Sequence, residues 1–136
     1  MDNIKRIIIP VDNTEDSKKA VKKGAKLAKL LGIDIKVITI NDTHHFISSV
    51  VIEEKLKKDA EAFLSIFKEI AKEEGVNLST ELITGKPAEE IVKYVTKDDL
   101  IIIAHHDRTQ GIDKFMETSV SRDVVRYAPC SVLVLK

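Results

Sequence analysis

The chain contains no tryptophan, only one cysteine and only five glycines among its 136 residues. The single cysteine, Cys130, cannot form an internal disulfide, which excludes a disulfide-stapled domain and favours a reducing compartment. No electropositive or helix-N-terminal setting is evident for Cys130, so a structural role is favoured over a catalytic one. No apolar run is long enough to span a bilayer.

The chain also lacks an excess of either charge, since 22 lysines and arginines balance 22 aspartates and glutamates. No summed field therefore draws it toward nucleic acid or toward a membrane, and neither partner is expected. Residues Met1 to Arg6 lead directly into an apolar segment without a signal-type stretch, so a cytoplasmic protein is expected. The length and the 43% hydrophobic content predict a single domain, residues 1–136.

Two hydrophobic periodicities alternate along the chain. Short β-branched runs have the character of buried strands, and the segments between them carry apolar residues three or four positions apart, as amphipathic helices do. Thr14 is placed to cap the first helix, Gly32 to end it, and Pro87 to begin the third. The expected strands are 6–11, 35–40, 78–83, 100–104 and 130–135, and the expected helices follow Thr14, span 50–74, begin at Pro87 and begin within 118–121.

This alternation predicts an α/β fold in which a parallel sheet has right-handed crossovers and helices on both faces. In the last third of the chain, the expected strand 100–104 is followed by a polar loop at 105–117. A hydroxyl-rich helix start at 118–121 comes next. Backbone N–H groups at a helix N-terminus beside the carboxyl end of a strand commonly hold anions and nucleotides. The loop has one glycine, Gly111, so its fit to a phosphate chain is open.

Three segments resemble the universal stress protein family: 7–12 (IIIPVD), 85–91 (GKPAEEI) and 119–134 (SVSRDVVRYAPCSVLV). The likeness covers the whole chain, and the serine-led helix, alanine-proline turn and valine-rich last strand are its most specific part. The resemblance implies a single-domain, open five-stranded parallel sheet of order 3-2-1-4-5, similar to adenine-nucleotide alpha-hydrolases and other Rossmann-like folds. It also implies that nucleotide would bind between strands one and four.

Nucleotide-binding members of that family carry the motif G-x-x-G, nine residues, then G-[S/T]. Laid on this sequence, the three glycines fall on His105, Arg108 and Thr118, while Ser119 keeps the hydroxyl. Glycine lets the backbone approach phosphates closely and adopt angles that a β-carbon hinders. The motif is therefore degenerate, and no cofactor is expected beyond weakly held ATP or AMP. Arg108 and Lys114 are still able to hold a small anion.

The resemblance implies further site positions on the base side of the nucleotide. Asp12 matches the carboxylate that meets the ribose and adenine region, Ile40 matches the apolar residue that lines the base, and Ala104 ends the fourth strand. From the residues alone, Asp12 fits equally well as a local cap for the turn that follows it. The expected nucleotide- or anion-binding set, if binding is retained, is Pro10, Val11, Asp12, Ile40, Ala104, His105, Arg108, Ser119, Val120 and Ser121.

All four histidines occur in two adjacent pairs, His44 with His45 and His105 with His106. Imidazoles gathered at one sheet edge are ligands for zinc or nickel. Adjacent histidines usually point apart, however, and no H-x-x-x-H spacing is present, so no metal is expected. No serine-histidine-aspartate arrangement or activated lysine is evident either, and the chain is expected not to be an enzyme, although slow ATP hydrolysis stays open.

The leading hypothesis is a cytoplasmic universal stress-response protein that acts as a homodimeric interaction or regulatory module, working through an unidentified protein partner. The dimer is expected at the last strand, whose residues Val132, Leu133, Val134 and Leu135 form an apolar run at the sheet edge. The alternative is an adenine-nucleotide-binding switch with slow or no hydrolysis. An ATP-pyrophosphatase is nearly excluded, because the loop 11–16 lacks the glycines and serines that such enzymes carry after strand one.

Overall fold

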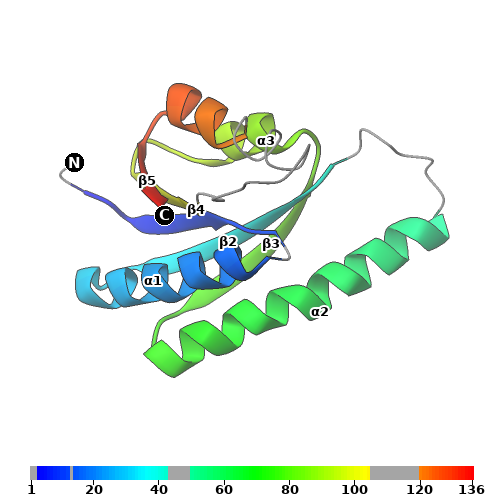
Figure 1. The fold of residues 1–136 in the computed structure, drawn as a ribbon, viewed down its shortest axis with the longest axis horizontal. Coiled ribbons are helices and arrows are strands. Elements are labelled where there is room, and N and C mark those ends of the chain that lie inside the picture. Colours follow the sequence, from blue (N-terminus) through cyan, green and yellow to red (C-terminus); the bar gives the residue numbers. More distant parts are fainter. Residues whose placement is uncertain (1–2, 13, 43–49, 105–119) are drawn as a thin grey trace.

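A computed structural model describes residues 3–12, 14–42, 50–104 and 120–136, without the side chains of residues 50–53 and 56. Strands and helices alternate, as the sequence predicts (Figure 1). Residues 120–127 form a further helical segment between the last two strands. The elements are β1 (Arg6–Pro10), α1 (Glu15–Leu31), β2 (Asp34–Asn41), α2 (Val50–Glu74), β3 (Leu78–Thr84), α3 (Pro87–Tyr94), β4 (Asp99–Ala104) and β5 (Ser131–Leu135).

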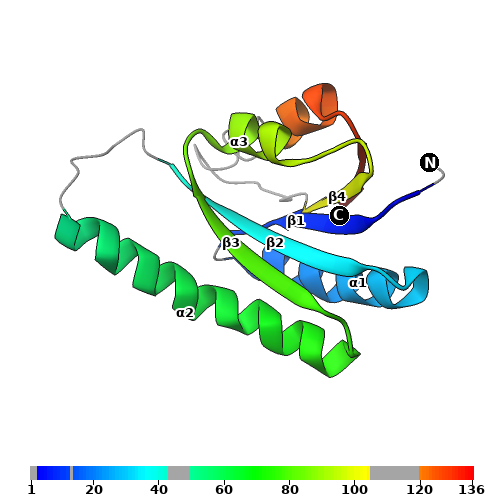
Figure 2. The ribbon, with the colours of Figure 1, turned by 180° about the vertical axis from the view of Figure 1, so that it is seen from behind.

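The five strands form one parallel sheet in the order β3-β2-β1-β4-β5, which confirms the predicted fold. Helices α1 and α2 cover one face, and α3 and the helical segment 120–127 cover the other (Figures 1 and 2). Strand β1 lies at the centre, and the chain moves outward from it first through β2 and β3 and later through β4 and β5. Within the described residues, no helix combines the length and apolar character needed to cross a membrane.

The central strands are apolar on both sides because helices cover both faces. Side chains of β1 alternate between two core clusters: Ile7 and Ile9 pack under α1 and α2, and Ile8 packs on the opposite side against Ile91 of α3 and Val124 of the segment 120–127. All three isoleucines are fully buried. A continuous apolar run is therefore the sequence signature of this strand.

Helix α1 begins and ends where the sequence predicts. Thr14 caps it, since its Oγ1 accepts a hydrogen bond from the backbone N–H of Ser17 at 3.2 Å. Gly32 ends it in the left-handed conformation, with φ of 68°, which glycine adopts without strain. The helix packs closely on the sheet through Gly24, where a β-carbon would lie 2.6 Å from Cδ1 of Ile9. That close approach explains a glycine in the middle of a helix.

Strand β4 begins at Asp99, one residue earlier than the apolar pattern predicts. The Asp99 side chain is 2% exposed and accepts from the guanidinium of Arg6 through both oxygens, at 2.7 and 3.2 Å. Its Oδ2 also accepts from the backbone N–H of Thr96 at 2.7 Å. The hydrogen bond to Asp99 raises the pKa of Arg6, whose guanidinium also lies 5.2 Å from the centre of the Tyr94 ring. This cluster joins the amino ends of β1 and β4 to the end of α3.

We expect Asp99→Asn to lower the free energy of unfolding by about 2 kcal/mol, because it leaves a partly buried guanidinium without its charged partner. Urea denaturation followed by circular dichroism measures the change. The neighbouring Asp98→Asn is a matched control, since Asp98 is more exposed and lies 3.8 Å from Lys5, an arrangement worth less than about 0.5 kcal/mol. Equal losses from the two variants would contradict the role given to Asp99.

Candidate functional site

The neighbouring strands β1 and β4 separate toward their carboxyl ends. Strand β1 pairs with β4 only from Arg6 to Ile8, opposite Asp99 to Ile101, whereas its pairing with β2 continues to Pro10. Strand β4 stays paired with β5 to its last residue, Ala104. Pro10 has no N–H to donate, so it cannot extend the ladder toward β4. The result is an opening at the point where the chain's crossovers diverge, which is the usual place for ligands in open α/β sheets.

A cavity of about 190 Å³ lies at this opening. This volume is below the ~300–1,000 Å³ of most small-molecule sites, so it accommodates only part of a large ligand. Its described walls come from the ends of three strands, from two helices and from the segment 120–127. The lining residues are Pro10, Val11, Asp12, Ser17, Ile40, Pro87, Ile91, Ile103, Ala104, Val120 and Ser121.

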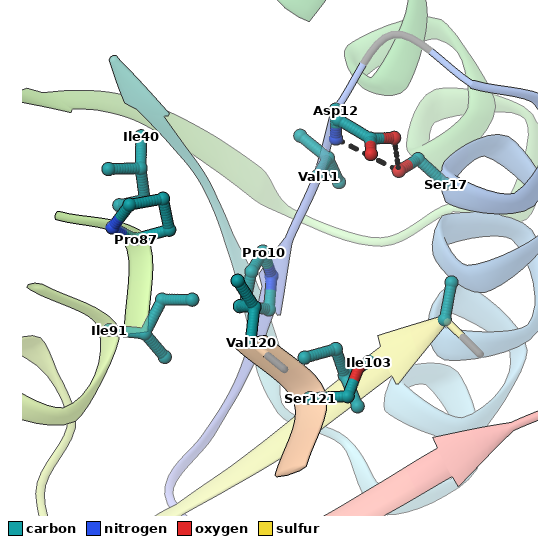
Figure 3. A pocket seen from close by; sticks show the side chains of 11 residues that line it. Pro10, Val11, Asp12, Ser17, Ile40, Pro87, Ile91, Ile103, Val120 and Ser121 are labelled. Atoms are coloured by element: carbon teal, nitrogen blue, oxygen red, sulfur yellow. Dashed lines mark hydrogen bonds between the residues drawn. The ribbon is translucent and has the colours of Figure 1, made fainter. Parts of the chain in front are cut away.

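The cavity has an apolar side and a polar side (Figure 3). Ile40, Pro87 and Ile91 lie together on the apolar side, where β2 faces the first turns of α3. Asp12 and Ser17 lie on the other side, where β1 leads into α1. The apolar wall suits a flat apolar ring. The Asp12 carboxylate and the Ser17 hydroxyl on the opposite side suit the hydroxyl groups of a sugar attached to that ring.

The polar side is organised by hydrogen bonds between the loop after β1 and the first turn of α1. The backbone N–H of Asp12 donates to Oγ of Ser17 at 2.9 Å, and this hydroxyl donates to Oδ1 of Asp12 at 2.8 Å. The hydroxyl of Thr14 donates to the same Oδ1. The Asp12 carboxylate is therefore turned toward α1 (Figure 3). Asp12 thus connects the loop after β1 to the start of α1, whereas Thr14 is the cap of that helix.

The neighbouring Val11 is held from the side of β2. Its N–H donates to the carbonyl of Ile38 at 2.9 Å, which continues the β1–β2 pairing one residue beyond the strand. Its carbonyl accepts from Oγ1 of Thr39 at 3.1 Å, and both side chains are buried. The backbone at the floor of the cavity is therefore fixed by β2 on one side and by α1 on the other.

Seven of the sequence-predicted site residues line this cavity: Pro10, Val11, Asp12, Ile40, Ala104, Val120 and Ser121. The other three, His105, Arg108 and Ser119, lie outside the described residues.

Sequence reasoning missed four lining residues, Ser17, Pro87, Ile91 and Ile103. Pro87 and Ile91 come from α3, which begins directly after the short connection that follows β3, and both belong to the wall of the cavity. A signal for Ser17 was present, since it stands three residues after the cap Thr14.

The remaining candidates are placed in part. The histidine pairs His44, His45, His105 and His106 lie outside the described residues, and among the residues that the structure describes no group of three metal-ligating side chains occurs. Burial raises the pKa of the Cys130 thiol, and the charge of Asp99 raises it further, so the thiol is poorly reactive.

Strand β5 is an edge strand paired only with β4 among the described strands, and residues 133 and 134 are 40% and 37% exposed.

The model of the universal stress protein family matches residues 3–136 of this chain. A curated relative is the universal stress protein MJ0531 of Methanocaldococcus jannaschii, which is 34% identical over 140 residues. These cover 97% of this chain and 82% of that protein.

Solved structures share the fold. The hypothetical protein MJ0577 has a TM-score of 0.80 and 26% identity, covering 98% of this chain and 96% of its own. A universal stress protein from Archaeoglobus fulgidus was solved in complex with dAMP (TM-score 0.72, 23% identity, 97% and 98% covered). Another was solved with cAMP (TM-score 0.75, 20% identity, 97% of each chain covered).

We expect Thr39→Val, which has nearly the same shape, to lower the free energy of unfolding by about 1 kcal/mol, because the buried Val11 carbonyl loses a donor. Chemical denaturation measures the effect. Thr84→Val is the matched control, since Thr84 is exposed at the end of β3 and should change stability by less than about 0.5 kcal/mol. A Thr39→Val protein as stable as the wild type would show that this bond does not hold the floor of the cavity.

Proposed function

The chain belongs to the universal stress protein family, and from that premise we propose that it acts as a cytoplasmic, homodimeric interaction or regulatory module of the stress response. In this proposal it binds an adenine nucleotide weakly or not at all and acts through a protein partner. Binding, rather than turnover, is its activity.

The observation that carries the proposal is the cavity itself, which combines an apolar wall with a polar edge at the divergence of β1 and β4. Ile40, Pro87 and Ile91 would together contact one face of an adenine ring, and Asp12 would accept from the ribose. Two proteins of the same fold were solved with nucleotides, dAMP and cAMP, that carry a single phosphate. The proposed site residues are therefore the ones that would contact the base and the sugar of a nucleotide.

The phosphate side of the site differs from the family's nucleotide-binding pattern in sequence. His105, Arg108 and Thr118 replace its three glycines, and Ser119 keeps the hydroxyl; all four positions lie outside the described residues. A β-branched residue in place of a glycine hinders the close approach of a triphosphate. We therefore propose that one phosphate, or a small anion, is accepted better than three.

A second function, an adenine-nucleotide switch with slow or no hydrolysis, is favoured by the same cavity. The two proposals differ in the affinity for ATP that each requires. A switch must bind ATP at the concentrations that it senses, whereas an interaction module need not.

The dimer proposal rests on the edge strand β5. Leu133 and Val134 expose apolar surface there, and Val125 and Tyr127 of the adjoining helical segment are 52% and 60% exposed. An uncovered strand edge with apolar side chains favours pairing with another chain. A two-fold arrangement would bring the same surface of two copies together.

We expect ATP to bind with a dissociation constant no tighter than tens of micromolar, or about −6 kcal/mol, because of the replaced glycines. AMP should bind as tightly as ATP or more tightly. Isothermal titration calorimetry with ATP, AMP and GMP measures both the affinity and the preference for adenine. Submicromolar ATP binding would contradict the interaction module and support the switch.

A gain-of-function variant tests the same point from the other direction. His105→Gly, Arg108→Gly and Thr118→Gly together should tighten ATP binding by more than they tighten AMP binding, because they restore the approach to the phosphates. Adding Asp12→Ala to this variant is the control and should remove the gain. If the triple variant gains nothing, the base side of the cavity is not a nucleotide site.

We expect the wild-type protein to be a dimer at micromolar concentration and Val134→Lys to be a monomer, because lysines would then face each other across the symmetric contact. Light scattering coupled to size-exclusion chromatography measures the mass. Thr84→Lys places the same charge on the other edge strand, β3, and should leave the dimer intact. A monomeric wild-type protein would refute the proposal.

A further inference from the structure

We propose that Ser17 is a positioning residue that sets the Asp12 carboxylate for the sugar of the nucleotide, an inference that rests on the proposed nucleotide binding. Ser17 is 2% exposed and lies on the first turn of α1, at the polar side of the cavity. Its hydroxyl is bonded to Asp12 twice. It therefore fixes both the backbone and the side chain of one residue.

The two hydroxyl hydrogens of this network can both be directed to the Asp12 carboxylate, and Thr14 Oγ1 also lies 3.4 Å from Ser17 Oγ. Ser17 Oγ accepts from the Asp12 N–H at 2.9 Å and uses its single hydrogen to donate to Asp12 Oδ1 at 2.8 Å. Thr14 Oγ1 accepts from the Ser17 N–H at 3.2 Å and uses its own hydrogen to donate to the same Oδ1. Each hydroxyl thus accepts from one backbone group and donates to the carboxylate. The carboxylate serves only as an acceptor in this arrangement.

The sequence of the first turn of α1 explains why the Ser17 side chain bonds to Asp12, which precedes the helix. In a capping box, the third residue after the cap is glutamate or glutamine, whose side chain reaches the N–H of the cap residue. In this chain the third residue after Thr14 is the shorter Ser17, and its hydroxyl bonds instead to the N–H of Asp12, two residues before the cap. Helix α1 therefore holds the loop after β1 as well as its own first turn.

This arrangement determines where the carboxylate is before any ligand arrives. Without the Ser17 hydroxyl, Asp12 keeps Thr14 as a donor but loses the bond that holds its backbone, so its carboxylate samples other positions. A group that accepts from a ligand binds best when it is already held in place. The apolar wall of Ile40, Pro87 and Ile91 lies on the other side of the cavity and does not depend on this bond (Figure 3). Ser17 should therefore matter for the sugar and not for the base.

The test compares Ser17→Ala with the wild type in NMR titrations with adenine, adenosine and AMP. We expect adenosine and AMP to bind roughly tenfold more weakly to Ser17→Ala, the loss of about one hydrogen bond to a charged group, while adenine changes by less than about twofold. Ser65→Ala is the matched control, because the Ser65 hydroxyl donates only to the Ala62 carbonyl on the exposed side of α2. Ser17→Thr, which keeps the hydroxyl, should restore adenosine binding.

The same spectra give a readout that needs no ligand. In Ser17→Ala the amide hydrogen of Asp12 should exchange with solvent at least about tenfold faster than in the wild type, since its acceptor is gone. Unchanged exchange, or equal losses for adenine and adenosine, would refute the positioning role while leaving nucleotide binding intact. Failure of the wild type to bind AMP and adenosine would refute both the role of Ser17 and nucleotide binding.

Discussion

The pairing of β1 with β4 is the constraint on which the arrangement of this protein depends. It places the first strand at the centre of the sheet, next to a strand that follows it by more than ninety residues, and so forces the chain to build outward in both directions. The pairing is short. It is fixed at the amino ends, where Arg6 and Asp99 are bonded side chain to side chain, and it stops after Ile8 and Ile101.

The two ends of this strand pair have opposite chemistry for that reason. At the amino end, the buried Asp99 carboxylate pairs with the Arg6 guanidinium and accepts from the backbone N–H of Thr96. This end of the strand pair therefore has a structural role. At the carboxyl end the strands separate, Pro10 donates nothing, and a cavity with an apolar and a polar side remains. One short ladder therefore accounts for both the stability of the centre and the location of the candidate site.

In the proposed nucleotide site, the base and sugar side and the phosphate side would depend on different parts of the chain. The first is built from strand ends and helix starts that the core already fixes, with Val11 held by Thr39 and Asp12 held by Ser17. The second would depend on the loop after β4, where the family's glycines are absent from the sequence.

The sequence by itself determined the elements and their order, because those depend on local properties: the apolar run Ile7 to Ile9, the helical periodicity of α1 and α2, the cap Thr14 and the terminator Gly32. Resemblance to a family supplied the strand order and seven of the residues that meet at the cavity. Only the tertiary structure added Asp99, Pro87, Ile91 and Ile103, since their roles arise from partners on other elements. Ser17 differs, because it bonds to Asp12 five residues before it and a local signal for it was present. Periodicity shows which face of an element is buried, but it does not show which side chains from separate elements meet, and that is what makes a cavity or a buried ion pair.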